Sequence, residues 1–218
     1  MSRSLRGTRI SLGLPSRIRA CLFDLDGVLV QTSHLHAAAW AEAVKELGRG
    51  IELPEGDVHD PPGAGTIRGL RERKDELFAA RVREDGVRPY PRSIEYLQAV
   101  HTAGLAIAAI SAHSSAREVL QSAGMVHLFV ERLDALDTEH LHLEGKPSPD
   151  TLLAATRALW VFPTETAVFD AAPTGISAAR AGSFGHIVGV DHVGRPDILR
   201  EHGADVVVRN LAELLHAA

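Results

Sequence analysis

Residues 20–28 read ACLFDLDGV, a short apolar run that ends in two acids two positions apart. An apolar run of this length is typical of a buried strand, and it places Asp24 and Asp26 at the strand's carboxyl end. Gly27 allows the sharp turn that must follow. Two carboxylates beside a buried strand are unfavourable unless a cation or a substrate pairs with them. The stretch therefore indicates a ligand site at a sheet edge, with an ordinary acidic surface turn as the alternative.

The chain around this stretch alternates short apolar runs with helical patterns. The predicted strands cover residues 18–23, 105–110, 167–169, 186–190 and 205–208, and the predicted helices lie near residues 92–103, 114–123, 149–159, 174–182, 195–202 and 210–216. Such alternation predicts an α/β fold, a doubly wound, Rossmann-like parallel sheet with helices on both faces.

One segment interrupts the alternation and suggests an insert. Residues 31–89 have mainly helix and loop character, with a polar Pro/Gly-rich section near residues 54–65. We expect this segment to be a small helical cap domain, placed after the first strand and over the edge where the strands end. Residues 18–30 and 90–218 would form the core domain, and residues 1–17 would be a loose basic tail.

Composition excludes several classes of protein. The chain has 218 residues, 45% hydrophobic and 23% charged, which is ordinary for a globular protein and not for a disordered one. A net charge of −5 argues against a general nucleic-acid binder. No run of about 18 apolar residues is present, so we expect no membrane span. A single cysteine, Cys21, cannot form an internal disulfide and fits a reducing, cytoplasmic location.

Three further polar residues follow later strands or precede a helix. Ser111 follows a predicted strand, Asp170 follows another, and Lys146 stands just before a predicted helix. In a parallel sheet these positions meet Asp24 and Asp26 at one edge. A set of acids with one hydroxyl and one ammonium suits phosphoryl transfer. One Asp attacks phosphorus, the other handles the proton, and Mg²⁺ bridges carboxylate and phosphate oxygens.

These motifs, in this order, resemble the haloacid dehalogenase superfamily and its beta-phosphoglucomutase-like branch over about residues 18–216. The resemblance implies that Asp24 is the nucleophile and Asp26 the acid/base. It implies that Ser111 and Lys146 bind the phosphoryl group, and that Asp24, Asp26 through its carbonyl, and Asp170 bind Mg²⁺. It also suggests substrate contacts from the cap and the second motif: His36, Trp40, Lys74 and Ala112.

The sequence departs from the family pattern in the fourth motif. The family has Glu-Asp where this chain has Asp170 and Ala171, so one carboxylate is missing and we expect weaker Mg²⁺ affinity. Asp170 could instead only cap the next turn. His113, in the second motif, could contact phosphate or be a polar loop residue.

The cap is also short, and its residues have structural alternatives. The family recognises its substrate with a basic residue of the cap, and Arg68 is the best match to that residue in this sequence. His36 and Trp40 lie four apart, which places them on one helix face toward the substrate or in the cap's own core. Lys74 could be a substrate contact or a solvated charge.

The sequence thus predicts a Mg²⁺-dependent phosphatase or phosphomutase that acts on a small phosphorylated metabolite, a sugar phosphate. A catalytically impaired homologue with a binding or regulatory role is the alternative, motivated by Ala171. A dehalogenase using Asp24 is a third possibility, which the second acid at Asp26 disfavours.

Overall fold

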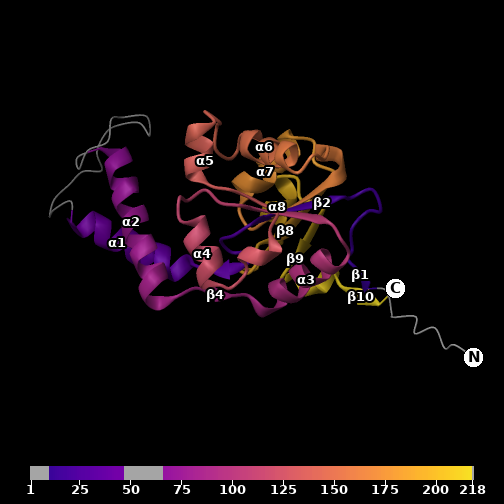
Figure 1. Ribbon diagram of the computed structural model, residues 1–218, viewed down its shortest axis with the longest axis horizontal. Helices are drawn as coiled ribbons and strands as arrows, with labels where there is room; N and C mark the ends of the chain where they lie inside the picture. The colour runs from indigo at the N-terminus through magenta and orange to yellow at the C-terminus, as the bar shows by residue number, and fades with distance from the viewer. Residues whose placement is uncertain (1–9, 47–65, 218) are drawn as a thin grey trace, which may run out of the picture.

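A six-stranded parallel sheet forms the centre of the computed structural model, which describes residues 10–46 and 66–217 (Figure 1). The strand order is β6-β5-β2-β7-β8-β9. The strands are β2 (Ala20–Asp24), β5 (Ala106–Ile110), β6 (Glu131–Leu133), β7 (Thr166–Asp170), β8 (His186–Val190) and β9 (Val206–Val208). This order confirms the predicted doubly wound α/β fold. The first strand occupies the middle of the sheet, so its carboxyl end lies between those of β5 and β7.

Helices cover both faces of this sheet (Figure 1). One apolar core packs α3 (Pro91–Thr102) and α4 (Ala116–Ser122) against side chains such as Phe23 and Phe169. A second core packs α6 (Asp150–Ala158), α7 (Pro173–Ala181) and α8 (Pro196–Glu201) against side chains such as Leu22 and Val168. Successive strand residues point to opposite faces, so a strand that is apolar throughout supplies both cores.

The edge strand β6 and the short helix after it, α5 (Ala135–His140), were not predicted. The strand has three residues, Glu-Arg-Leu, and only the leucine is buried. A strand so short and polar carries no apolar run or alternation to reveal it. It forms because Ala108–Ile110 of β5 offer it a parallel partner.

Two predictions at the chain ends were wrong. Residues 210–216 form a short 3-10 helix (Leu211–Leu214) and then strand β10 (His216–Ala217), not an α-helix. This strand pairs antiparallel with β1 (Ile10–Ser11), and the Tyr96 hydroxyl donates to the Leu12 carbonyl oxygen. The tail is therefore not loose from residue 10 onward, because backbone pairing and apolar contacts attach it to the core. Residues 1–9 lie outside the described residues.

The predicted insert leaves and rejoins the core through β3 (Val30–Gln31) and β4 (Arg88–Pro89), which pair antiparallel. Its helices α1 (Ser33–Glu46) and α2 (Ile67–Asp85) pack on each other and stand beside the core (Figure 1). The Pro/Gly-rich section at residues 54–65 lies outside the described residues. None of the described helices is long and apolar enough to cross a membrane.

Candidate active site

Four polar side chains meet at the carboxyl edge of the sheet. Asp24 ends β2 and Asp170 ends β7, while Ser111 directly follows Ile110, which is the residue paired with Asp24. Lys146, from the loop before α6, reaches both acids: its Nζ lies 2.5 Å from Asp24 Oδ1 and 2.6 Å from Asp170 Oδ2. Two carboxylates from different strands therefore share one ammonium.

This arrangement shifts the ionisation of its members. Burial raises the pKa of Asp24 to about 8; the Lys146 ammonium opposes the rise, and the charges of Asp170 and Asp26 add to it. Burial also acts against the charge on Lys146, but Asp170 and Asp24 outweigh it and hold the pKa of the ammonium above its usual value. When both acids are ionised, the cluster carries one net negative charge, which an added cation would neutralise.

Asp170 divides its two oxygens between two tasks. Its Oδ1 accepts a hydrogen bond of 2.8 Å from the Ala172 amide, and its Oδ2 contacts Lys146. Asp170 therefore caps the turn before α7, which the sequence allowed as an alternative role. It also contacts Lys146 at the sheet edge. Ala171 packs against the core under the sheet edge.

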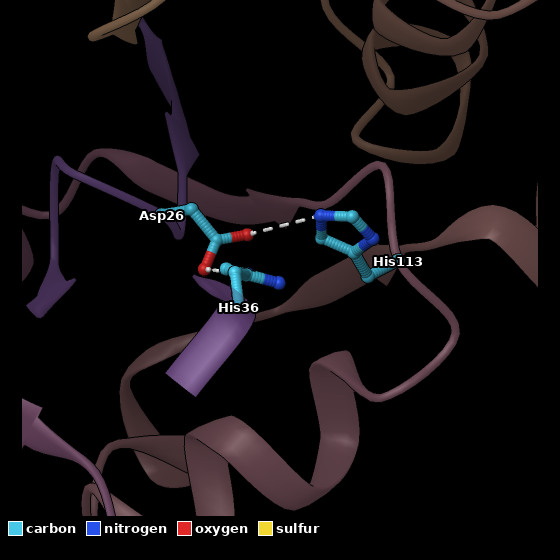
Figure 2. Close-up of side chains that lie close together, drawn as sticks. All are labelled: Asp26, His36 and His113. Atoms are coloured by element: carbon cyan, nitrogen blue, oxygen red, sulfur yellow. Dashed lines mark hydrogen bonds and ion pairs between the residues drawn. The ribbon is translucent and has the colours of Figure 1, made fainter. Parts of the chain in front are cut away.

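Asp26 lies beside this group and is contacted mainly from the cap side of the chain. The Thr32 hydroxyl donates to its Oδ1, and His36 Nε2 lies 3.3 Å from the same oxygen. The other oxygen faces His113 Nε2 at 4.0 Å (Figure 2). Burial would raise the pKa of Asp26, but His36, His113 and Thr32 outweigh burial and hold it below its usual value.

A cleft of about 670 Å³ opens over these residues. Its core side includes Asp24, Asp26, Ser111, Ala112, Lys146 and Asp170. Its cap side comes from one face of α2, with Arg68, Arg71, Glu72 and Asp75. The cleft therefore lies between α2 and the sheet edge that carries Asp24, Asp26 and Asp170.

A model of the haloacid dehalogenase-like hydrolase family matches residues 18–182, which include Asp24, Ser111, Lys146 and Asp170. The chain belongs to the haloacid dehalogenase-like hydrolases. This membership confirms the resemblance seen in the sequence and shows an enzyme of the phosphatase or phosphomutase type.

Relatives of the hydrolase agree with this assignment. Beta-phosphoglucomutase of Mycobacterium bovis is 38% identical over 246 residues and covers 94% of each chain. Fructose-1-phosphate phosphatase YqaB of Escherichia coli is 28% identical, covering 76% of this chain and 93% of its own. Among solved structures, CbbY from Rhodobacter sphaeroides in complex with phosphate superposes with a TM-score of 0.74 at 22% identity, covering 90% and 96% of the two chains.

The structure brings together only part of the predicted substrate contacts of this hydrolase. Ala112 lines the cleft, and His36 contacts Asp26. Trp40 and Lys74 are not among the described side chains that line the cleft. Lys74 is only 2% exposed, donates to Asp75 at 2.9 Å and lies near the rings of Trp40 and Phe78. It is therefore not the solvated charge that the sequence allowed.

Three cap residues at the cleft, Arg71, Glu72 and Asp75, were not predicted. The buried stripe of α2 is Leu70, Lys74, Phe78 and Val82, one residue in every four. Arg71 and Asp75 lie beside this stripe, one position after Leu70 and Lys74, and Glu72 follows Arg71, so a period search would have placed all three on one polar face. They were missed because Lys74, a charged residue, interrupts the apolar stripe and so obscures which face of α2 is buried.

The donor set at the sheet edge fits Mg²⁺. Carboxylate oxygens of Asp24 and Asp170 approach one point closely enough to share Lys146, and hard oxygen donors are what Mg²⁺ requires. Ala171 contributes no side-chain oxygen, so other oxygens, such as those of water and substrate, would have to complete the six ligands.

The Asp170 carboxylate lies so close to α7 that position 175 has room only for glycine. A Cβ at this position would overlap the Asp170 carboxylate. We expect Gly175→Ala to lower the free energy of unfolding by about 1–3 kcal/mol through overpacking, although alanine normally favours a helix. Urea denaturation measures this change. Gly145→Ala is the control, because no atom lies within 4 Å of a Cβ there. Equal stability of the two variants would show that α7 does not constrain Asp170.

Proposed function

We propose that this hydrolase is a Mg²⁺-dependent phosphoryl-transfer enzyme that acts on a small sugar phosphate through an aspartyl-phosphate intermediate on Asp24. The observation that supports it most is the meeting of Asp24, Lys146 and Asp170 at one point of the cleft. A nucleophilic carboxylate and a cation that can hold phosphoryl oxygens are then in place together.

In this mechanism Asp24 attacks phosphorus while Lys146 and the Ser111 hydroxyl hold the phosphoryl oxygens. Mg²⁺, when bound, supplies positive charge that favours the ionised form of Asp24 and the charge of the phosphoryl group. Asp26 protonates the leaving oxygen, and it then takes a proton from the water or hydroxyl that attacks the phosphoenzyme. The lowered pKa of Asp26 suits the second of these steps, which needs a base.

The substrate class follows from the relatives and from the cap. The names of the two relatives refer to a phosphoglucose and to fructose 1-phosphate, both phosphorylated sugars. On the cap side of the cleft, Arg68 is paired with Glu72 and Glu139 at 3.0 Å each. Arg71 forms no ion pair with any described residue, so it is available for a hydroxyl or a second phosphate of the substrate.

We expect Arg71→Gln to raise KM for a sugar phosphate by about 10-fold, a loss of about 1.4 kcal/mol of binding. The rise should be smaller for p-nitrophenyl phosphate, which offers the cap no hydroxyl or second phosphate. Steady-state kinetics with both substrates measure the difference. Arg68→Gln is the matched control, because that arginine is already paired, and an equal effect of the two changes would contradict the role of Arg71.

One assay tests the proposed function itself. The protein is incubated with Mg²⁺ and either β-glucose 1-phosphate or fructose 1-phosphate, and both free phosphate and glucose 6-phosphate are measured. Release of phosphate identifies a phosphatase, and formation of glucose 6-phosphate identifies a mutase. Product formation from neither, or turnover that persists in Asp24→Asn, would contradict the proposal.

Ala171 is the observation behind the alternative of an impaired homologue. The alanine is partly buried against the core, whereas Asp170 keeps an oxygen directed at Lys146. The remaining carboxylates therefore still form a cluster that a cation can join, which favours an active enzyme. If Asp170→Glu with Ala171→Asp leaves the Mg²⁺ affinity unchanged, the altered motif is not what limits metal binding.

A further inference from the structure

Two histidines face one carboxylate in the cleft, outside the Asp24–Lys146–Asp170 cluster. His36 comes from α1 of the cap, and His113 comes from the loop after β5 of the core. Figure 2 shows both rings directed at the two oxygens of Asp26. His36 Nε2 lies 3.3 Å from one oxygen and His113 Nε2 lies 4.0 Å from the other. All three ligand atoms lie within 4.8 Å of one another.

Both rings are held by contacts that leave the Asp26 side of each one accessible. His36 stacks on Phe78 with ring centroids 4.0 Å apart and an interplanar angle of 3°. Its other nitrogen, Nδ1, is buried and has no hydrogen-bond partner among the described residues, so no second bond pulls the ring away. The two imidazoles lie 4.4 Å apart, centroid to centroid.

His113 also has a carboxylate behind it. Its Nδ1 lies 3.5 Å from Asp75 Oδ1 and 3.4 Å from Lys74 Nζ, and Lys74 is itself paired with Asp75. In the tautomer with its proton on Nδ1, His113 donates to Asp75 and has a free lone pair on Nε2, whereas the Lys74 ammonium, which can only donate, favours the other tautomer. This carboxylate–histidine arrangement is the usual support of a metal-ligating imidazole.

We propose that the side chains of Asp26, His36 and His113 bind a divalent transition-metal ion of the zinc type, at a site distinct from that of Mg²⁺, to which the family resemblance assigns only the carbonyl oxygen of Asp26. The chemistry of the donors distinguishes the two sites. Two imidazoles and one carboxylate favour zinc, cobalt or nickel, whereas Mg²⁺ prefers oxygen donors such as Asp24 and Asp170. Three protein ligands leave further positions for water, as in open zinc sites.

The present separations are close to what such a site needs. Bonds of about 2.0–2.2 Å from a tetrahedral zinc ion place ligand atoms about 3.3–3.6 Å apart. His36 Nε2 already has this separation from Asp26 Oδ1 at 3.3 Å, whereas His113 Nε2 lies 4.0 Å from the other oxygen, Oδ2. The three ligand atoms, all within 4.8 Å of one another, would therefore have to move closer together. Since His113 is in a loop and 30% exposed, a small rotation of its ring closes the site.

The ion would have two consequences. It would join the cap to the core, because its ligands come from both. It would also occupy the carboxylate that the proposed mechanism uses as acid/base, and would thus inhibit turnover; only this second consequence depends on the proposed function. Metal binding can be measured without any substrate.

The test uses Co²⁺, whose visible absorption reports its ligands, with the full-length protein and saturating Mg²⁺. We expect one Co²⁺ per chain, with bands that Zn²⁺ displaces, and isothermal titration gives the Zn²⁺ affinity. His113→Gln should weaken that affinity at least 10-fold. Asp170→Asn should keep the Co²⁺ bands, because Asp170 belongs to the other site.

The control for surface histidines is the double change His140→Gln with His142→Gln, which should leave binding unchanged. Thermal melting shows that each variant is folded. The proposal is overturned if the wild-type protein binds no Co²⁺, if His113→Gln binds it equally well, or if binding is lost in Asp170→Asn or in the double variant.

Discussion

Lys146→Met is expected to lower the free energy of unfolding by about 3–5 kcal/mol in metal-free buffer. The side chain is 13% exposed and contacts two acids, Asp24 at 12% and Asp170 at 2% exposure. Methionine fills the same space without the charge, so two neighbouring carboxylates are left buried without the cation between them. For a domain of this size, the loss corresponds to a fall in Tm of about 6–20 °C.

Added Mg²⁺ should recover part of this stability in Lys146→Met, because it binds the folded state and replaces the lost positive charge. The control is Lys74→Met, the other buried lysine. It is paired with Asp75, which keeps His113 as a partner, and methionine packs well against the neighbouring aromatic rings. Its effect should stay below about 1.5 kcal/mol and should not respond to Mg²⁺. A Lys146→Met protein as stable as the wild type in metal-free buffer would refute the shared ion pair.

Asp24→Asn is expected to abolish turnover and to stabilise the metal-free protein. An amide is a poor nucleophile, and removal of a nucleophile costs at least about 10⁴-fold in kcat. The same change removes one of the two acids around Lys146 and so relieves the excess negative charge. We expect a gain of about 1–2 kcal/mol, or about 2–8 °C in Tm.

The stability gained through Asp24→Asn should increase as the pH rises. The pKa of Asp24 is raised to about 8 in the folded protein, far above the ordinary value for an aspartate. Between about pH 4 and pH 8 the folded state therefore holds a proton that the unfolded chain has lost. The wild type loses stability as pH rises through this range, and Asp24→Asn does not. The difference in Tm between the two proteins should widen from pH 6 to pH 9 in metal-free buffer. A constant difference would contradict the raised pKa.

The central sheet could be predicted because buried parallel strands are apolar along their whole length. The stretch at residues 20–24 and those at 106–110 and 186–190 stand out in the sequence for this reason. Strand β6 and the strand pair that joins the two chain ends could not be predicted. Each has two or three residues, and its pairing depends on partners far away in the chain.

The same distinction applies to the candidate site. Asp24, Ser111, Lys146 and Asp170 follow from the rule that the carboxyl ends of parallel strands meet, and the structure brings them together. The residues on the cap side of the cleft were harder to predict, because they depend on which face of α2 lies toward the cleft. Lys74 has the sequence character of a solvated residue but is buried against Trp40 and Phe78, while Arg71 faces the cleft. Side-chain partners from another element, such as Asp75 for His113, leave no local signal.

The most direct test of the proposed mechanism is fluorine NMR of the protein with Mg²⁺ and beryllium fluoride, which mimics an aspartyl phosphate and needs no knowledge of the substrate. The account predicts bound fluorine resonances that require Mg²⁺ and that are absent from folded Asp24→Asn. Bound resonances that persist in Asp24→Asn, or none in the wild type at saturating Mg²⁺, would contradict phosphoryl transfer through Asp24.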